Sequence, residues 1–299
     1  LIYRDPMQAN LEKLLEGYNA GCINGEIEFA FWNLLSYSGI ALYTGQELTK
    51  LGKDLTTFVK RSIQSQTAAA CGIVPCLSAA LELNGNPEAE HVYQRFLNTS
   101  EDCLLQLDDR RTCVLIWTKR KFMRVMKNDM NGAVEVYKSA LHHPLFGTRK
   151  KYPFKTITHI MNVFLDGLIA FYAARIDIYE KKKWLAVGLE SLNLMKKWTK
   201  VSAWNFESKL LLCEAEHLFL KGSELALEKY KASVISARNS RFFHEEGLGY
   251  SKLGFYHLSQ GRKAAAAQSF AKSKKCYEQW GAHTLVNGMQ IVDMISREI

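Results

Sequence analysis

Proline, patterned cysteine and long uninterrupted apolar runs are all scarce in this chain of 299 residues. The 5 prolines leave room for long helices, because proline interrupts a helix interior. Strand-like alternation of apolar and polar residues is also scarce, which argues against a β-sheet core. A hydrophobic fraction of 47% with 23% charged residues is the balance of a folded globular protein. A soluble, cytoplasmic helical protein is therefore expected.

The most apolar stretch, residues 157–174, is interrupted by His159, Asn162 and Asp166. A spanning helix needs about 20 mostly apolar residues, so we expect a buried helix and no membrane span. No basic segment followed by an apolar core opens the chain, so no secretory signal is visible. Because the chain starts at Leu1 and ends inside an apolar periodic run, we expect a fragment of a larger protein.

The cysteines are scattered and contain no C-x-x-C pair. Zinc sites and small disulfide frameworks need closer, patterned spacing. Reduced, buried thiols are expected, as in a cytosolic protein, with no metal and no cofactor. The seven are Cys22, Cys71, Cys76, Cys103, Cys113, Cys213 and Cys276.

One pattern of small and aromatic residues recurs along the chain. Near the C-terminus, Leu253-Gly254 and a turn at Gly261 precede Ala266 and Phe270. Small residues let two antiparallel helices approach closely, and large residues fill the space between them, which is the tetratricopeptide layout. The second-helix spacing recurs at Ala226, Tyr230 and Ser233, at Ala133, Tyr137 and Ala140, and at Ala30, Leu34 and Tyr37.

These repeats predict an all-α, tetratricopeptide-like α-solenoid. Residues 1–299 would form one domain, a right-handed superhelix of about twelve antiparallel helices. Pro75 is expected to kink or break the helix that contains it. The helix count between residues 64 and 108 stays open, because that stretch departs from the pattern. The remaining helices are expected at residues 7–22, 47–63, 67–83, 156–179, 183–198 and 204–220.

Two strings resemble a known family. They are N-G-E-I-E-F-A at residues 24–30, continuing into F-W-N, and C-Y-E-Q-W-G-A at residues 276–282. Both look like parts of the helical repeat region that follows the signal-transducing, AAA-like ATPase module of large multidomain sensor kinases, which also carry GAF and histidine-kinase modules. The resemblance implies a sensory or autoinhibitory scaffold. It transfers no catalytic residue, because the kinase and ATPase motifs of that family lie outside this region.

No motif predicts catalysis. The chain has no G-x-x-x-x-G-K-[ST] phosphate loop. Glu214 and His217 form a Glu-x-x-His pair, but a di-iron bundle needs a second such pair and two further glutamates. A packing role for His217 is therefore expected. A metal-dependent helical enzyme built around this pair remains a rival hypothesis.

A basic amphipathic helix is predicted within residues 117–127. Arg120, Arg124 and Lys127 share one face, which could bind an acidic protein segment, a membrane or nucleic acid. The alternative is a solvated outer face of a repeat. Nucleic acid is the less favoured partner, because no pattern of aromatic residues interleaved with charge is visible.

The inner wall of the solenoid is the second candidate surface. First helices of tetratricopeptide arrays line a concave groove that accepts a peptide or a helix. The equally open alternative is packing against a neighbouring repeat. The predicted groove residues are Leu211, Ala215, Ser251, Phe255 and Leu258.

The net charge of +9 is concentrated in one part of the chain. Residues 141–200 hold eleven Lys and Arg against four Asp and Glu, which leaves +7 there. An acidic partner is therefore favoured. The main hypothesis is a non-catalytic protein-interaction and sensor scaffold, the regulatory region of a signal-transduction ATPase or kinase, with a protein, a peptide or the parent's own ATPase or kinase domains as partner. The alternative is a structural subunit of a large assembly that contacts an acidic partner or nucleic acid.

Overall fold

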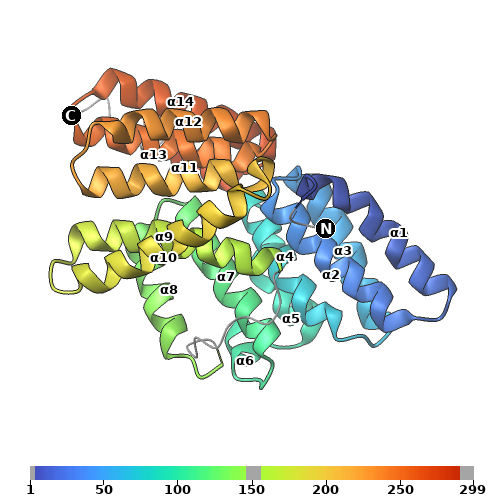
Figure 1. The fold of residues 1–299 in the computed structure, drawn as a ribbon. Helices are drawn as coiled ribbons and strands as arrows, with labels where there is room; N and C mark the ends of the chain where they lie inside the picture. Colours follow the sequence, from blue (N-terminus) through green and yellow to red (C-terminus); the bar gives the residue numbers. More distant parts are fainter. Residues whose placement is uncertain (1–3, 146–155, 290–299) are drawn as a thin grey trace.

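A computed structural model describes residues 4–145 and 156–289 of the chain (Figure 1). Every regular element in these two ranges is helical, which confirms the all-α expectation. The α-helices are α1 (Asn10–Ile23), α2 (Ile27–Tyr43), α3 (Leu48–Gln64), α4 (Ala69–Asn84), α5 (Val92–Leu97), α6 (Glu101–Leu105), α7 (Arg110–Met126), α8 (Met130–His142), α9 (Ile157–Ile176), α10 (Lys181–Thr199), α11 (Ala203–Leu220), α12 (Leu225–Asn239), α13 (Phe243–Ser259) and α14 (Lys263–Trp280). Two 3₁₀ helices, η1 (Met7–Ala9) and η2 (Pro87–His91), and a helical segment at 283–289 complete them.

Most helices pack against the next helix along the chain. The pairs are α1 with α2, α3 with α4, α7 with α8, α9 with α10, α11 with α12, and α13 with α14. In Figure 1 the last two pairs lie stacked together, with α9 and α10 beside them and α1 to α4 at the other end of the molecule. More helices are present than the twelve or so expected, and the short α5 and α6 account for part of the excess.

Small residues set the distance between paired helices. Ala226 and Ala266, in the second helices of their pairs, are both fully buried. A Cβ atom added at Gly254 of α13 would lie 2.5 Å from the ring of Phe270 in α14. The glycine therefore lets the aromatic ring lie directly on the helix backbone. The alanines of the two other copies, at positions 30 and 133, are also fully buried in the second helices α2 and α8.

Pro75 does not end its helix. Helix α4 runs from Ala69 to Asn84 with Pro75 inside it, and Gly85 in a left-handed conformation (φ 79°) follows the last residue. Residues 72–81 are all buried between neighbouring helices. Tertiary packing thus maintains a helix that the missing proline N–H would weaken in isolation. Of the two expected effects of Pro75, a kink or a break, the continuous helix contradicts the break.

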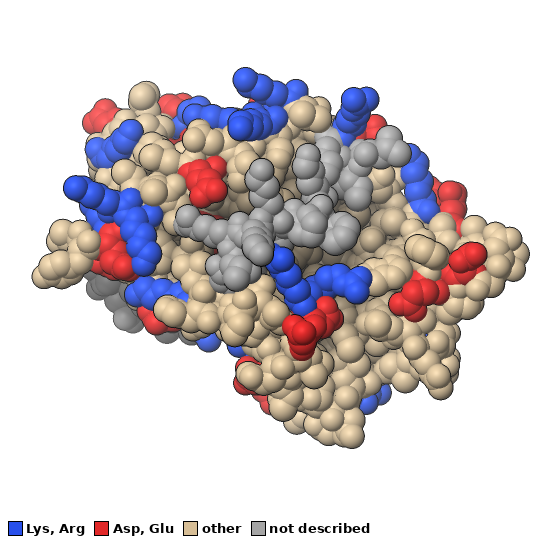
Figure 2. All heavy atoms as spheres, turned by 60° about the horizontal axis from the view of Figure 1, so that its bottom comes forward, with Lys and Arg blue, Asp and Glu red and all other residues tan. Residues whose placement is uncertain are grey.

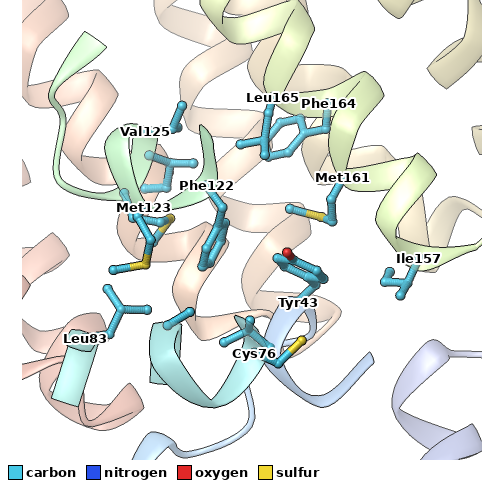
Figure 3. Packing of buried hydrophobic residues seen from close by; sticks show 14 of the residues in the cluster. Tyr43, Cys76, Leu83, Phe122, Met123, Val125, Ile157, Met161, Phe164 and Leu165 are labelled. Carbon is cyan, nitrogen blue, oxygen red and sulfur yellow. The ribbon is translucent and has the colours of Figure 1, made fainter. Parts of the chain in front are cut away.

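The core connects helices from both ends of the chain. Tyr43 of α2 contacts Phe122 of α7 edge-to-face, with ring centroids 5.2 Å apart, and Phe122 also contacts Trp280 of α14 at 6.4 Å. Figure 3 shows the Phe122 ring beside Tyr43, with Met161 and Phe164 of α9 on the same side of it. One continuous hydrophobic cluster therefore holds the first and last helix pairs together.

Hydrogen bonds reinforce this contact between the ends. The Met7 amide donates to Asn205 Oδ1 of α11 at 2.9 Å. The Trp280 indole N–H donates to the carbonyl oxygen of Gln46 at 3.0 Å. The row of helix pairs therefore folds back, so that α11 to α14 pack on the segments that flank α1 to α4.

Helix α9 is long and apolar enough to cross a membrane by length and composition alone. However, 83% of its most apolar window is buried inside the fold. It packs against α10, α11, α7 and α8. A core helix of a helical protein has the same length, composition and burial.

Candidate partner-binding surfaces

The five predicted groove residues, Leu211, Ala215, Ser251, Phe255 and Leu258, lie on α11 and α13. Ala215 and Ser251 are buried, so neither lies on the surface of this structure. The ring of Phe255 contacts Phe270 of its own helix pair, with centroids 5.0 Å apart. Leu211 and Leu258 are partly exposed. The structure thus places most of this set in packing contacts between helices.

Partly buried ion pairs join the first helices of successive pairs. Lys121 of α7 binds Asp166 of α9, with Nζ 2.5 Å from Oδ1. Arg175, near the C-terminal end of α9, binds Glu216 of α11 at 2.6 Å. The Tyr230 hydroxyl donates to the same carboxylate at 2.8 Å. Burial would raise the pKa of Glu216, but the nearby cations, Arg175 above all, hold that pKa below its ordinary value.

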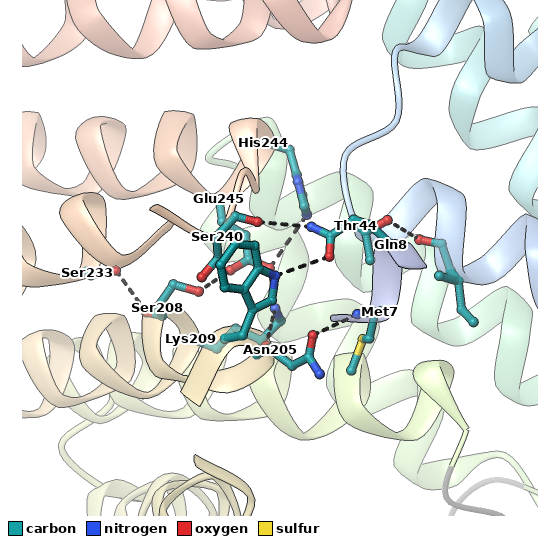
Figure 4. A network of polar contacts seen from close by, with 12 residues as sticks. Met7, Gln8, Thr44, Asn205, Ser208, Lys209, Ser233, Ser240, His244 and Glu245 are labelled. Atoms are coloured by element: carbon teal, nitrogen blue, oxygen red, sulfur yellow. Dashed lines mark hydrogen bonds and ion pairs between the residues drawn. The ribbon is translucent and has the colours of Figure 1, made fainter. Parts of the chain in front are cut away.

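The same line of contacts continues to α13 and returns to α7. Lys209 of α11 forms an ion pair with Glu245 of α13, and the Ser208 hydroxyl donates to that carboxylate at 2.6 Å (Figure 4). Lys252 of α13 donates to Asn128, just after α7, at 3.1 Å. Burial lowers the pKa of Lys252 to about 8. The facing sides of these helices are therefore occupied by contacts within the chain, where a groove was expected.

His244 lies next to this network, at the contact between the chain ends. Its side chain is 1% exposed and packs against Gly45 and the ring of Trp280, with the latter centroids 5.3 Å apart. Figure 4 shows it above Thr44 and beside Glu245. Burial lowers the pKa of His244 to about 4, although Glu245 opposes that shift. The ring is thus held neutral near pH 7.

Each cation of the predicted basic face already pairs with a carboxylate of this chain. Lys119 and Lys121, in the same segment, are buried. An acidic partner would have to displace these carboxylates to bind here. The pairs are Arg120 with Glu101 and Asp102 (2.5 and 2.6 Å), Arg124 with Asp129 (2.5 Å), and Lys127 with Glu82 (2.6 Å).

Helix α10 carries a different set of cations. Lys181, Lys182, Lys197 and the C-cap residue Lys200 are exposed, and none forms an ion pair with any residue that the structure describes. Figure 2 shows basic side chains gathered at the left of the molecule, the end at which the α9–α10 turn lies in Figure 1. The lysines of α10 are thus available to a partner. Four other cations counted in the basic region, at positions 149, 150, 151 and 155, lie outside the described residues.

Apolar side chains accompany the lysines at the C-terminal end of α10. Val201 is 56% exposed and Trp204, in the first turn of α11, is 40% exposed. The Trp204 indole N–H reaches Gln8 Oε1 at 3.4 Å. Lys200 directly precedes Val201, and Lys197 lies four residues before it. We call these four side chains the α10–α11 surface. Nothing in the local sequence distinguished the lysines of this surface from the cations of α7. Whether a cation is paired depends on carboxylates that other segments of the chain bring close to it.

Glu214 and His217 both take part in structural contacts. Glu214 binds Lys229 at 2.6 Å and lies 3.7 Å from Lys196. His217 stacks on Phe171 of α9, with centroids 4.9 Å apart. Partial burial, together with nearby lysines, lowers the pKa of His217. Within residues 4–145 and 156–289, no three His, Cys, Asp or Glu side chains are grouped so that they could hold a metal ion.

The cysteines are all unpaired. Burial raises the pKa of Cys76 and that of Cys276 to about 12, so neither thiol ionises near neutral pH. Cys113 and Cys213 are also buried. Cys22 and Cys71 are half-buried and Cys103 is exposed, so these three depart from the expectation of buried thiols. A comparison with protein-family models finds no match for this chain, and a comparison with curated proteins finds none either.

Proposed function

We propose that this chain is a tetratricopeptide-like α-solenoid that acts as a non-catalytic protein-interaction and sensor scaffold, the regulatory repeat region of a larger signal-transduction ATPase or kinase. Two equivalent hydrogen bonds support the repeat. The Ser233 hydroxyl donates to the carbonyl oxygen of Ser208 at 2.9 Å. Forty residues later, the Ser273 hydroxyl donates to that of Gly247 at 2.6 Å. The same small residue thus joins second helix to first in two successive pairs.

The partner in this proposal is an acidic protein segment, and its binding site is the α10–α11 surface. Neither Lys197 nor Lys200 pairs with a carboxylate of the described residues, and this carries the assignment, because cations that already pair within the chain must lose a carboxylate before binding another. Trp204 adds the kind of partly exposed aromatic anchor that dominates the energetics of many interfaces. The lysines would speed the encounter and select an acidic sequence.

The cations of α7, which already form ion pairs, are a weaker candidate site for an acidic partner. Arg120, Arg124 and Lys127 each contact a carboxylate at 2.5 to 2.6 Å. Their charges are neutralised locally, so they contribute little to attraction at a distance. The metal-enzyme hypothesis has equally little support, because Glu214 and His217 serve contacts between helices.

A titration tests the assignment. A fluorescently labelled peptide of alternating glutamate and leucine is added to the full chain, and fluorescence anisotropy reports binding. The variant Lys197→Glu/Lys200→Glu is expected to bind at least about tenfold more weakly, because two attractive contacts become repulsive. Trp204→Ala is expected to weaken binding by a similar factor through loss of apolar contact.

The matched control is Lys53→Glu/Lys60→Glu on α3, which makes the same change in net charge. Both lysines are exposed and neither pairs with a described residue. Binding that falls equally in the control and in the α10 variant would show that net charge alone acts, and would contradict the assigned surface. A labelled single-stranded oligonucleotide in place of the peptide tests the nucleic-acid alternative.

A further inference from the structure

The turn between α9 and α10 exposes a cluster of large apolar side chains. Ile178 is 80% exposed, Tyr179 is fully exposed, and Ile176 at the end of α9 is 55% exposed. In Figure 1 this turn lies at the left extremity of the molecule, at the outer end of its helix pair. Exposure of three neighbouring large apolar residues costs solvation free energy unless another apolar phase covers them.

Cations follow these residues directly. Lys181 and Lys182 are exposed and unpaired among the described residues. The two acids of the turn are engaged locally. Asp177 accepts the Glu180 amide at 3.0 Å, and Glu180 pairs with Lys183 at 2.8 Å. The turn therefore presents an apolar tip with two available positive charges beside it.

We propose that the α9–α10 turn binds the surface of an anionic lipid bilayer. Ile178 and Tyr179 enter the boundary between headgroups and acyl chains, where tyrosine is enriched in membrane proteins. Lys181 and Lys182 remain at the level of the headgroups and contact their negative charges. Helix α9 stays buried in the fold, so the chain lies on the bilayer and does not cross it.

The shape of the turn favours a bilayer over a second copy of the chain. The α1–α2 turn is also apolar, with Ile23 84% and Phe29 69% exposed, but its charges are the acids Glu26 and Glu28. The two turns are thus complementary in charge. Both are narrow outer ends of helix pairs, however, and a stable protein interface needs about 1,200 Å² of well-packed surface. A fluid bilayer covers a convex tip without a complementary hollow.

Co-sedimentation with vesicles tests this assignment. The full chain is mixed with vesicles of equal parts phosphatidylserine and phosphatidylcholine, and with vesicles of phosphatidylcholine alone. Sedimentation is expected with the anionic vesicles only and should weaken as salt rises. Ile178→Ser/Tyr179→Ser is expected to reduce partitioning about tenfold or more through lost apolar contact. Lys181→Gln and Lys182→Gln should each reduce it about fivefold.

The α1–α2 turn provides the matched control. Ile23→Ser/Phe29→Ser also removes two large, exposed apolar side chains but should leave partitioning unchanged. No sedimentation with anionic vesicles, full binding by the Ile178→Ser/Tyr179→Ser variant, or equal loss in the control would overturn the assignment. Analytical ultracentrifugation tests a second copy of the chain as the occupant. Self-association that is lost in both double variants would identify a second copy, and not a bilayer, as the partner of this turn.

Peptide binding through Lys197 and Lys200 should persist in the Ile178→Ser/Tyr179→Ser variant. The nearer of these lysines, Lys197, lies about 24 Å along α10 from Lys181, the first residue after the α9–α10 turn, given a rise of about 1.5 Å per residue. The vesicle and peptide experiments can therefore fail independently of one another.

Discussion

At the scale of single residues, close packing of glycine against aromatic rings sets the spacing within helix pairs. Gly254→Ala places a methyl group 2.5 Å from the ring of Phe270. Although alanine favours the helix, this overpacking should destabilise the fold by about 1–3 kcal/mol. Urea denaturation followed by circular dichroism measures the change. Gly288→Ala is the control, because no atom of the described residues lies within 4 Å of its added methyl group. Equal behaviour of the two variants would refute the packing role.

A second residue-scale prediction concerns His244. Its pKa is about 4 in the folded chain and 6.5 in the unfolded chain, so the unfolded state binds the extra proton between these values. The contribution of the neutral, buried ring to the free energy of unfolding is therefore fully present above pH 6.5. It is lost as the pH falls towards 4. The loss should be on the order of 3 kcal/mol relative to His244→Gln. Urea denaturation over this pH range measures both proteins, and parallel curves would contradict the burial argument.

At the scale of helices, buried ion pairs lock neighbouring elements together. Lys209→Met leaves the Glu245 carboxylate buried beside the Ser208 hydroxyl without its cation. This change should cost about 3–5 kcal/mol, because an uncompensated buried charge remains. Adding Glu245→Gln should restore much of that stability. A double-mutant cycle by urea denaturation measures the coupling, and strictly additive effects would show that the pair does not join α11 to α13.

Local pattern was sufficient to predict most helices of this fold. The helix expected at residues 204–220 is α11 (Ala203–Leu220), and that expected at 183–198 is α10 (Lys181–Thr199). The short α5 was not predicted, because Asn98 in a left-handed conformation ends it after 6 residues, too few for a periodic signal. Pro75 does not break its helix, because the packing that buries it outweighs the intrinsic preference of proline.

The candidate surface was harder to predict than the helices. Lys121 and Lys197 look alike in sequence, as basic residues of amphipathic helices. The first is buried against Asp166, which lies 45 residues away, whereas the second is exposed. Such pairing depends on which helices become neighbours, and local periodicity carries no information about that. The line of buried ion pairs from α7 to α13 was missed for the same reason.

At the scale of the whole molecule, the row of helix pairs folds back on itself. Trp280 and Met7 tie the last and first segments together by hydrogen bonds, and Phe122 lies in the core between them. The facing sides of α7, α9, α11 and α13 are consequently filled by contacts within the chain. A partner is therefore expected on the outside, at unpaired cations, and not in an inner groove.

Hydrogen–deuterium exchange with and without the glutamate–leucine peptide tests this central claim most directly. Bound peptide should slow exchange in residues 196–204, which span the α10–α11 surface, and leave α7 unchanged. Slower exchange in residues 117–127, or along α11 and α13 at the predicted groove residues, would place the partner elsewhere and contradict the account.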